Sequence, residues 1–189
     1  MPKRPRRRFG TSQKERIFFA CLPDEETASR IHALALSLAR DKTLNGTLIL
    51  PEHLHVTLFH LGDWHRLPNE IVDLARSAAQ NVRAPPFDVS FKRARSFSNR
   101  TGVYPFVLSG DLPQWSALRT QLGAALKGAG LGAATQGEFK PHMTLLRDED
   151  RVRPFAIEPV GWTVKDFVLV HSLLGKTTHI HLGRWRLNP

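Results

Sequence analysis

The chain has 189 residues, 41% of them hydrophobic, and carries a formal net charge of +10 at pH 7. Its length suits one compact domain with its own core, its single cysteine excludes an internal disulfide and a cysteine-based zinc cluster, and no stretch approaches the ~20 apolar residues of a membrane span. The positive charge favours polyanionic partners, because cationic surfaces attract phosphates over long range.

The first segment of the chain is strongly basic. A lysine and four arginines alternate with two prolines within residues 1–10, and this composition cannot bury enough apolar surface to fold. We predict that residues 1–15 are a disordered tail, either solubilising or an arm that holds RNA, and that residues 16–189 are a single domain. No signal peptide follows the charged start, and Cys21 sits in an apolar run as a buried small hydrophobe. We therefore expect a cytoplasmic, monomeric protein.

The first half of the domain is predicted to form strand, helix and strand. Residues 16–22 form a buried apolar strand, a helix opens at Asp24, and residues 54–62 form the next strand. A second helix begins at Pro68. Its predicted apolar stripe consists of Ile71, Leu74, Ala75 and Ala78.

The same order of elements returns in the second half. After a hairpin of strands over residues 87–97 and 103–110, a helix begins near Asp111 and a strand follows over residues 139–147. The spacing between the strands that flank the helix is nearly the same in both halves. This similarity indicates a degenerate internal duplication.

The duplication predicts the fold class. We expect an α+β protein with two lobes related by a pseudo-twofold axis, each an antiparallel sheet with packed helices. Two apolar strands near the C-terminus, residues 166–174 and 178–187, are predicted to complete the second lobe. The active site is expected in the cleft between the lobes.

The clearest part of the repeat is a tetrapeptide, HVTL beginning at His55 and HMTL beginning at His142. Positions i and i+2 share one face of a strand, so His55 and Thr57 point the same way, as do His142 and Thr144. A pseudo-twofold that brings the two strands together makes a pocket with two facing imidazoles and two hydroxyls. Such a pair can hold one neutral base and one charged acid at once. This suits displacement at phosphorus without a metal or cofactor, with His55 and His142 as catalytic residues.

The second copy carries an additional cation, Arg147, five residues after His142. Strict alternation along a strand puts these two side chains on opposite faces, so Arg147 can reach a phosphate only if the strand ends or bends near Leu146. The alternative interpretation is a solvated arginine at the strand end beside Asp148 and Glu149.

These features resemble the two-histidine (2H) phosphoesterase superfamily, which is defined by two His-x-Thr motifs in two lobes. The similarity is closest to its RNA 2′,3′-cyclic phosphodiesterases, also called 2′-5′ RNA ligases. The stretches that carry the resemblance are RIFFACLP, LHVTLFHLG and FKPHMTLLRD. It runs from about Arg16 to the C-terminus.

The resemblance implies a reaction and a role for each residue. His55 carries over as general acid and His142 as general base in the hydrolysis of a 2′,3′-cyclic phosphate to a 2′-phosphomonoester. Thr57, Thr144 and Arg147 carry over as residues that bind the substrate phosphate. The implied partners are RNA 3′ ends, or nucleotides, that carry a 2′,3′-cyclic phosphate. Run in reverse, the same site would join RNA ends through a 2′-5′ bond.

Two stretches depart from the family pattern. Members commonly have Asn-Leu before the first catalytic histidine and Phe-Leu-Gly after the motif, whereas this chain has His53-Leu54 and His60-Leu61-Gly62. Both stretches flank the first His-x-Thr core, so they bear on how the strand is held or how a base is stacked.

A histidine-based metallohydrolase is a second hypothesis. His53 with His55, and His179 with His181, form i, i+2 pairs that can bind zinc from a strand. Against it, no carboxylate or third histidine recurs at ligand spacing, and the duplicated threonine has no role as a zinc ligand. The single histidines, expected to be solvated or hydrogen-bonded, are His32, His60, His65 and His171.

A non-catalytic RNA-binding module is a third hypothesis. Phe91 and Phe97 are interleaved with basic residues in a pattern that suits stacking on bases and contact with phosphates. The basic residues of this stretch are Lys92, Arg93, Arg95 and Arg100. An amphipathic hairpin with its phenylalanines in the core is the simpler structural interpretation.

Overall fold

The computed structural model of the chain describes residues 14–111 and 113–188. These residues form nine strands, three α-helices and three short 3-10 helices. The α-helices are α1 (Glu25–Asp41), α2 (Asn69–Gln80) and α3 (Ser116–Gly128). The strands are β1 (Glu15–Cys21), β2 (Thr47–Leu48), β3 (Val56–Trp64), β4 (Phe87–Ser96), β5 (Tyr104–Gly110), β6 (His142–Asp148), β7 (Phe155–Val164), β8 (Asp166–Leu173) and β9 (Thr178–Arg186). The 3-10 helices are η1 (Pro51–His53), η2 (Pro113–Trp115) and η3 (Gly132–Thr135).

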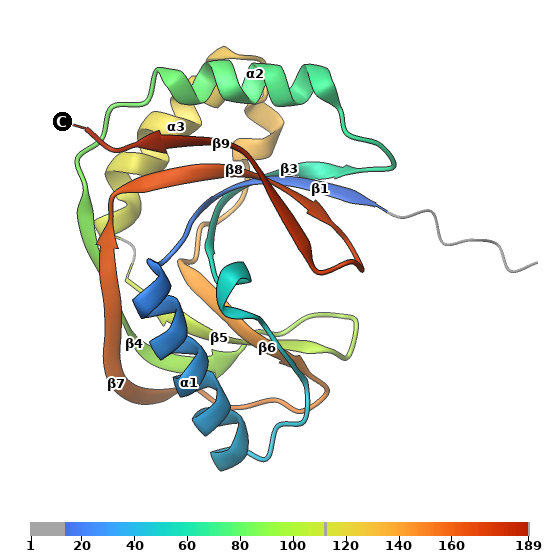
Figure 1. Cartoon of the computed structure of the whole chain (residues 1–189), viewed down its shortest axis with the longest axis vertical. Coiled ribbons are helices and arrows are strands. Elements are labelled where there is room, and N and C mark those ends of the chain that lie inside the picture. The colour runs from blue at the N-terminus through green and yellow to red at the C-terminus, as the bar shows by residue number, and fades with distance from the viewer. Residues whose placement is uncertain (1–13, 112, 189) are drawn as a thin grey trace, which may run out of the picture.

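The nine strands form one antiparallel sheet in the order β7-β4-β5-β6-β3-β1-β8-β9, with β2 paired to β6. Within the described part of the chain, its two halves meet at one register pair, Val56 of β3 with Met143 of β6. Figure 1 shows the two halves diverging from this junction. The predicted α+β class with antiparallel strands is therefore confirmed, and the two half-sheets prove to be continuous.

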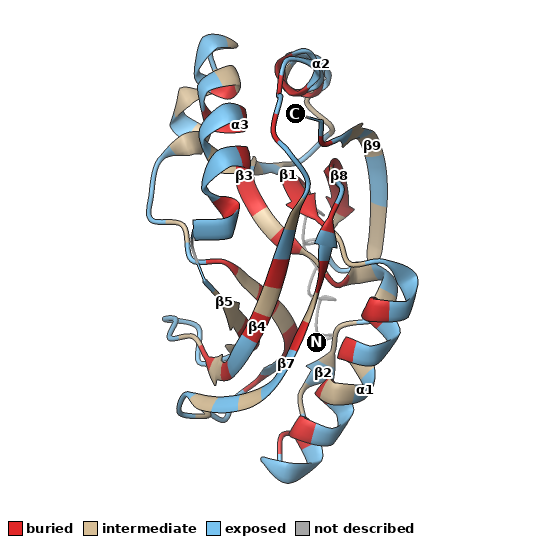
Figure 2. Cartoon of the chain, turned by 90° about the vertical axis from the view of Figure 1, so that its left-hand side faces the viewer, coloured by how far each residue is buried: buried red, intermediate tan, exposed pale blue. Residues whose placement is uncertain are grey.

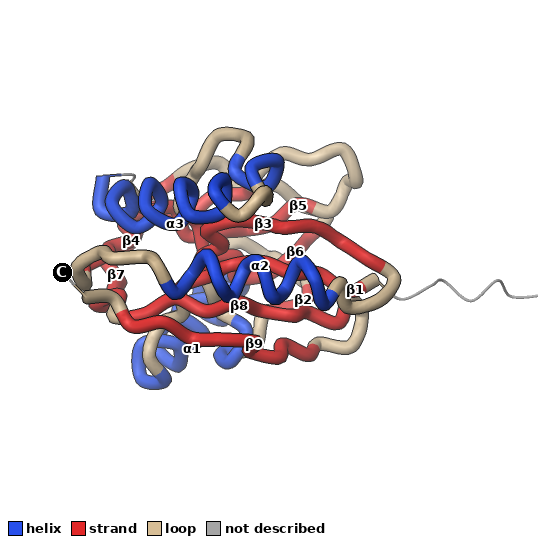
Figure 3. The backbone as a smooth tube through the Cα atoms, turned by 90° about the horizontal axis from the view of Figure 1, so that it is seen from above, coloured by secondary structure: helices blue, strands red, loops and turns tan. Residues whose placement is uncertain are grey.

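Each half of the sheet is covered by a helix from the other half. Helix α1 follows β1 in the chain but contacts β6 and β7, whereas α3 follows β5 but packs on Phe59 of β3. The approach of α3 requires Gly123, because a Cβ at that position would lie 3.2 Å from the Phe59 ring. Helix α2 lies beside α3 and β9. In Figure 3, which looks down on the molecule, α2 and α3 lie on the near side of the strands and α1 lies on the far side.

Helix α1 shows how local sequence and packing agree. Asp24 caps its N-terminus by accepting a hydrogen bond from the backbone N–H of Thr27 at 2.8 Å, and Glu25 and Glu26 in the first turn suit the positive end of the helix dipole. Ile31 and Ala35 lie on its buried face. Figure 2 shows these buried positions alternating with exposed ones along the helix.

One prediction about the strands was incorrect, and one strand was not predicted. The C-terminal strands do not complete the second half: β8 pairs with β1, and β9 pairs with β8, so both belong to the first half. The second half is completed instead by β7, which pairs with β4. The sequence did not predict β7 because Pro159 and Gly161 interrupt its alternation, and the pairing is irregular just before Val160.

Several boundaries also differ from the predicted ones. Strand β1 begins at Glu15, one residue before the predicted start of the domain, and β3 continues beyond residue 62 to Trp64. The remaining basic tail, residues 1–13, lies outside the described residues. The buried face of α2 is rotated from the predicted stripe and consists of Val72, Ala75, Ala78 and Ala79. No helix in the described ranges is long and apolar enough to cross a membrane.

Candidate active site

The two tetrapeptides of the repeat lie side by side at the junction of the half-sheets. Since Val56 pairs with Met143 in antiparallel register, His55 lies opposite Thr144 and Thr57 opposite His142. Val56 and Met143 are fully buried, whereas the histidines and threonines are half-buried on the opposite face. The structure therefore brings the four polar residues of the repeat together on one surface.

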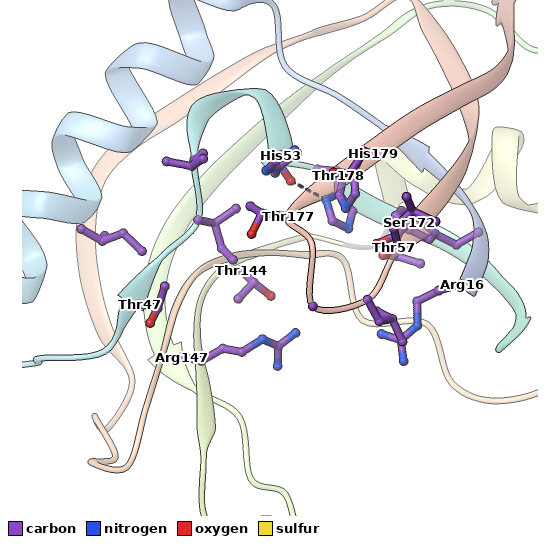
Figure 4. A pocket seen from close by; sticks show the side chains of 18 of the residues that line it. Arg16, Thr47, His53, Thr57, Thr144, Arg147, Ser172, Thr177, Thr178 and His179 are labelled. Carbon is purple, nitrogen blue, oxygen red and sulfur yellow. Dashed lines mark hydrogen bonds between the residues drawn. The ribbon is translucent and has the colours of Figure 1, made fainter. Parts of the chain in front are cut away.

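A cavity of about 580 Å³ opens on this surface, which is within the usual size of a small-molecule site. The five residues singled out from the sequence all line it: His55, Thr57, His142, Thr144 and Arg147. Figure 4 shows Arg147 extending into the cavity from one side and Arg16 from the other. The cavity is therefore cationic on two opposite walls.

The two imidazoles are held in the same way. Nδ1 of His55 donates to the backbone carbonyl of His53 at 2.6 Å, and Nδ1 of His142 donates to the carbonyl of Lys140 at 2.7 Å. A carbonyl can only accept, so both Nδ1 atoms carry the proton. Each neutral ring thus keeps the Nε2 lone pair available to a ligand, and each charged ring offers an Nε2 proton.

Burial controls the charge of both histidines. It lowers the pKa of His55 to about 4, and the nearby positive charges of His142, His53 and Arg147 act in the same direction. Burial also lowers the pKa of His142, although the hydrogen bond to the Lys140 carbonyl opposes the change. Both rings are therefore neutral at pH 7 in the free protein. A bound phosphate would favour protonation of one of them, because a nearby negative charge stabilises imidazolium.

A β-bulge brings Arg147 to the same wall as His142. In the pairing of β5 with β6, Val107 is opposite Thr144 and Phe106 is opposite Leu146, so Leu145 is an extra residue. The extra residue shifts the alternation by one. Leu145 and Leu146 are both buried, and Arg147 returns to the cavity face. The bend that the sequence required near Leu146 is therefore present.

The backbone around Arg147 is anchored by its neighbour Asp148. The Asp148 carboxylate accepts hydrogen bonds from the backbone N–H groups of Asn45 and Gly46 at 2.7 and 2.5 Å, which tie the segment before β2 to the end of β6. The pKa of Asp148 is lowered, most strongly by a hydrogen bond from the backbone N–H of Asp150 and further by those from Asn45 and Gly46. Gly46 is required there because a Cβ would lie 1.9 Å from the Arg147 carbonyl oxygen.

Comparisons with known proteins identify the family of the chain. The sequence profile of the 2′-5′ RNA ligase superfamily matches residues 23–176, most of the chain. The chain belongs to this superfamily. No curated protein matches it in sequence.

Solved structures share the fold of this superfamily member. The protein TT0787 of Thermus thermophilus superposes with a TM-score of 0.70 at 24% identity, over 91% of this chain and 97% of that one. LigT of Escherichia coli complexed with 3′-AMP gives a TM-score of 0.67 at 24% identity, over 93% and 99%. LigT complexed with phosphate gives 0.65 at 25% identity, over 94% and 99%. The resemblance seen in the sequence is thus confirmed, and the superfamily supports an activity of the phosphoesterase or 2′-5′ RNA ligase type.

The first half of this superfamily member repeats the bulge but carries a different residue after it. In the pairing of β1 with β3, Ala20 is opposite Thr57 and Phe19 is opposite Phe59, so Leu58 is the extra residue. His60 therefore occupies the position that Arg147 has in the second half. It lines the same cavity. The sequence carried this signal, since His60 follows His55 by the same five positions that separate Arg147 from His142.

His60 is part of a polar cluster on β1 and β3 that the sequence did not predict. Its Nε2 lies 2.9 Å from Oδ1 of Asp63, and Arg16 forms a two-pronged ion pair with the same carboxylate at 2.7 and 2.8 Å. The pairing with Arg16 lowers the pKa of Asp63 well below its usual range. This wall of the cavity therefore presents a partly neutralised cation, whereas Arg147 makes no ion pair with any residue in the described ranges.

His179 completes the wall around His55. Its ring centroid is 4.5 Å from that of His53 and 5.5 Å from that of His55. Burial, followed by the charges of His55 and His53, lowers the pKa of His179 to about 3. His181, its predicted partner in a zinc pair, is exposed and does not line the cavity. Residues 14–111 and 113–188 contain no group of three or more His, Cys, Asp or Glu side chains placed to hold a metal.

Proposed function

We propose that this protein hydrolyses a 2′,3′-cyclic phosphate at an RNA 3′ end, or on a nucleotide, to a 2′-phosphomonoester. The observation that carries the proposal is the matched pair of histidines. Each donates Nδ1–H to a carbonyl two residues earlier, so each offers Nε2 to the cavity. Two imidazoles with the same tautomer, on either side of the sheet junction, suit a reaction in which one group loses a proton and another gains one.

In the proposed reaction a water molecule attacks phosphorus opposite the O3′ atom. Nε2 of His142 takes a proton from the water, the P–O3′ bond breaks, and Nε2 of His55 gives its proton to O3′. The products are a 2′-phosphomonoester and a free 3′-hydroxyl. The two histidines exchange protonation states during the reaction, and proton exchange with solvent restores them.

The remaining cavity residues suit stabilisation of charge on the phosphate. The hydroxyl of Thr57 lies beside His142, and that of Thr144 lies beside His55. Both hydroxyls can donate hydrogen bonds to the non-bridging oxygens of the phosphate. Arg147 adds a permanent positive charge with several donors. Since the equatorial oxygens of the phosphate carry more negative charge in the transition state, these contacts should strengthen as water attacks.

The complexes of LigT support a phosphate-binding cavity. One contains phosphate and another contains 3′-AMP, and both ligands carry the chemical group that we propose Arg147 and the two threonines bind here. Ligation to a 2′-5′ bond is the same reaction in reverse, with a 5′-hydroxyl in place of water. Because water is present at a far higher concentration than an RNA end, we propose hydrolysis as the dominant direction.

The test is to identify the product from adenosine 2′,3′-cyclic phosphate with and without EDTA. We expect adenosine 2′-phosphate, separable from the 3′ isomer by chromatography, at the same rate in both conditions. Loss of activity in EDTA with recovery on adding zinc would favour the metallohydrolase instead. Binding of a cyclic-phosphate-ended oligonucleotide without turnover would favour the RNA-binding module.

A further inference from the structure

A row of basic and aromatic residues continues the active-site face across the second half to strand β4. Arg95 of β4 is opposite Val107 of β5, and Val107 is opposite Thr144 of β6. Residues opposite one another in antiparallel strands point to the same face of the sheet. Arg95 therefore lies two strands away from Thr144, on the face that bears the cavity.

Phe97 connects this arginine to the active site. Its ring centroid is 4.8 Å from that of His142, and the guanidinium carbon of Arg95 lies 4.8 Å from the Phe97 ring centroid. Unlike Phe91, which is fully buried in the core, Phe97 is only partly buried. It is therefore an accessible aromatic surface between the catalytic cavity and Arg95.

Arg95 lines a second cavity, of about 500 Å³, together with Arg151 and Arg153. The lining contains no carboxylate, and none of the three arginines forms an ion pair with another described residue. The Nε atom of Arg95 is buried without a hydrogen-bond partner, although buried donors are nearly always satisfied. Arg151 is positioned by donating to the Ser98 hydroxyl at 2.7 Å.

We propose that this arginine cavity is a second anion site, which holds a phosphodiester of the RNA chain upstream of the terminal cyclic phosphate. The proposal rests on the proposed function of the catalytic cavity. Three guanidinium groups without an ion pair and a buried N–H without an acceptor favour an anion with several oxygens. A phosphodiester fits because guanidinium binds phosphate oxygens through paired hydrogen bonds. The placement of Phe97 between the two cavities suits a nucleotide whose base stacks on its ring.

A second anion site predicts a preference for substrates that are longer than one nucleotide. A substrate of one nucleotide fills the catalytic cavity alone, whereas a substrate with internal phosphodiesters also reaches Arg95, Arg151 and Arg153. We therefore infer that the substrate is an oligonucleotide 3′ end in preference to a mononucleotide. One charged phosphodiester at a defined distance from the end carries the preference.

The experiment compares four substrates with the full chain. They are a cyclic-phosphate mononucleotide, a trinucleotide ending in a 2′,3′-cyclic phosphate, and two trinucleotides in which one or the other phosphodiester is replaced by a neutral methylphosphonate. A charge-assisted contact corresponds to about a tenfold change or more. We expect kcat/KM for the trinucleotide to exceed that for the mononucleotide, and to fall about tenfold for one of the two analogues.

Variants then assign the preference to the cavity. Arg153→Ala and Arg95→Gln should bring the two methylphosphonate analogues and the unmodified trinucleotide to equal kcat/KM. Arg30→Ala is the matched control, because it removes the same charge from an exposed position on α1 and should leave the difference intact. The salt dependence provides a second readout, since loss of one phosphate contact should reduce the slope of log affinity against log salt by about 0.7.

The outcomes separate the two proposals. If the wild-type protein hydrolyses the mononucleotide and treats all three trinucleotides alike, the second anion site is wrong and the proposed function stands. If Arg30→Ala removes the preference as fully as Arg153→Ala, the preference comes from net charge, and the site is again wrong. If no cyclic phosphate is hydrolysed, including that of the mononucleotide, the proposed function itself fails.

Discussion

Val56 pairs with Met143, and this pair is the point at which the two half-sheets of the described chain join. Each of these residues follows a histidine that lines the cavity. Since His142 begins β6 and His55 immediately precedes β3, the separation of the two histidines is set by backbone pairing between these strands, and each ring is oriented by a carbonyl two residues earlier. Sites built on regular elements keep their geometry more closely than sites on loops, which is what an acid and a base acting on one phosphorus atom require.

The first prediction concerns the two histidines of the cavity. His55→Ala and His142→Ala should each lower kcat/KM for a 2′,3′-cyclic nucleotide by about 10²–10⁴, the usual contribution of a positioned acid or base. His181→Ala is the matched control, since His181 is exposed and outside the cavity. Far-ultraviolet circular dichroism should show that all three variants are folded. A near-wild-type rate in either cavity variant would exclude a two-histidine reaction.

The second prediction concerns the hydroxyls of Thr57 and Thr144. A hydrogen bond to a charged oxygen contributes about 1.5–3 kcal/mol, so Thr→Val at either position should lower kcat/KM by about 10- to 150-fold. Valine keeps the β-branched shape that suits a strand. Thr120→Val, at an exposed position on α3, is the control. The hypothesis fails if the cavity variants lower the melting temperature but spare the rate.

The third prediction compares Arg147 with its counterpart His60. Arg147→Met should lower kcat/KM by about 10- to 150-fold, because the phosphate loses an unpaired cation. His60→Met should cost less, since Asp63 already engages both His60 and Arg16. Both rates can be measured with the same cyclic nucleotide. Equal losses at the two positions would mean that the cavity binds phosphate symmetrically.

Much of the site could be predicted from the sequence because its His-x-Thr motif occurs twice. The spacing of His55 and His142 within two similar halves indicated a paired site, and strand alternation placed Thr57 and Thr144 beside them. The position of Arg147 could not be derived, because a bulge is defined by the partner strand and leaves no mark in the bulged strand itself. The equal spacing of His60 was visible, but its role depends on Asp63 and Arg16, which only the fold brings together.

The partners of the C-terminal strands were harder to predict. The two apolar runs in β8 and β9 were recognised as strands, but chain order suggested the wrong half of the sheet. The true neighbour of β8 is β1, the first strand of the domain, and a pairing over that separation has no local signal; β9 then pairs with β8. Strand β7 was missed for a different reason, since Pro159 and Gly161 break the pattern on which strand prediction depends.

The fourth prediction concerns stability in acid. The pKa values of His55 and His179 are lowered to about 4 and about 3 in the folded protein, against about 6.5 in the unfolded chain. Their contribution to stability is therefore fully present above pH 6.5 and is lost as the pH falls toward 4. Within that window, each unit fall in pH lowers the free energy of unfolding by about 1.4 kcal/mol per histidine. For a domain of this size, each kcal/mol lost lowers Tm by about 2–4 °C.

Thermal denaturation between pH 4.5 and 7.5 provides the measurement for this prediction. His179→Phe should flatten the fall in Tm, because it removes one group that must remain neutral and one repulsive partner of His55. His32→Phe serves as the control, on a helix remote from β9 in the chain. A Tm that is constant from pH 7.5 to pH 5 would show that these histidines do not resist protonation in the fold.

The fifth prediction assigns the acid and the base. The hydrogen bonds of the two rings are equivalent, so the assignment of His55 as acid rests on the resemblance to the superfamily. A substrate with sulfur in place of O3′ leaves as a thiolate, which needs less help from an acid than an alkoxide does. The loss caused by His55→Ala should therefore shrink to less than about tenfold with the 3′-thio substrate, whereas the loss caused by His142→Ala should remain at about 10²–10⁴. The reverse pattern would exchange the two roles. If each variant loses the same factor with the 3′-thio substrate as with the normal one, proton donation to the leaving group does not limit the rate.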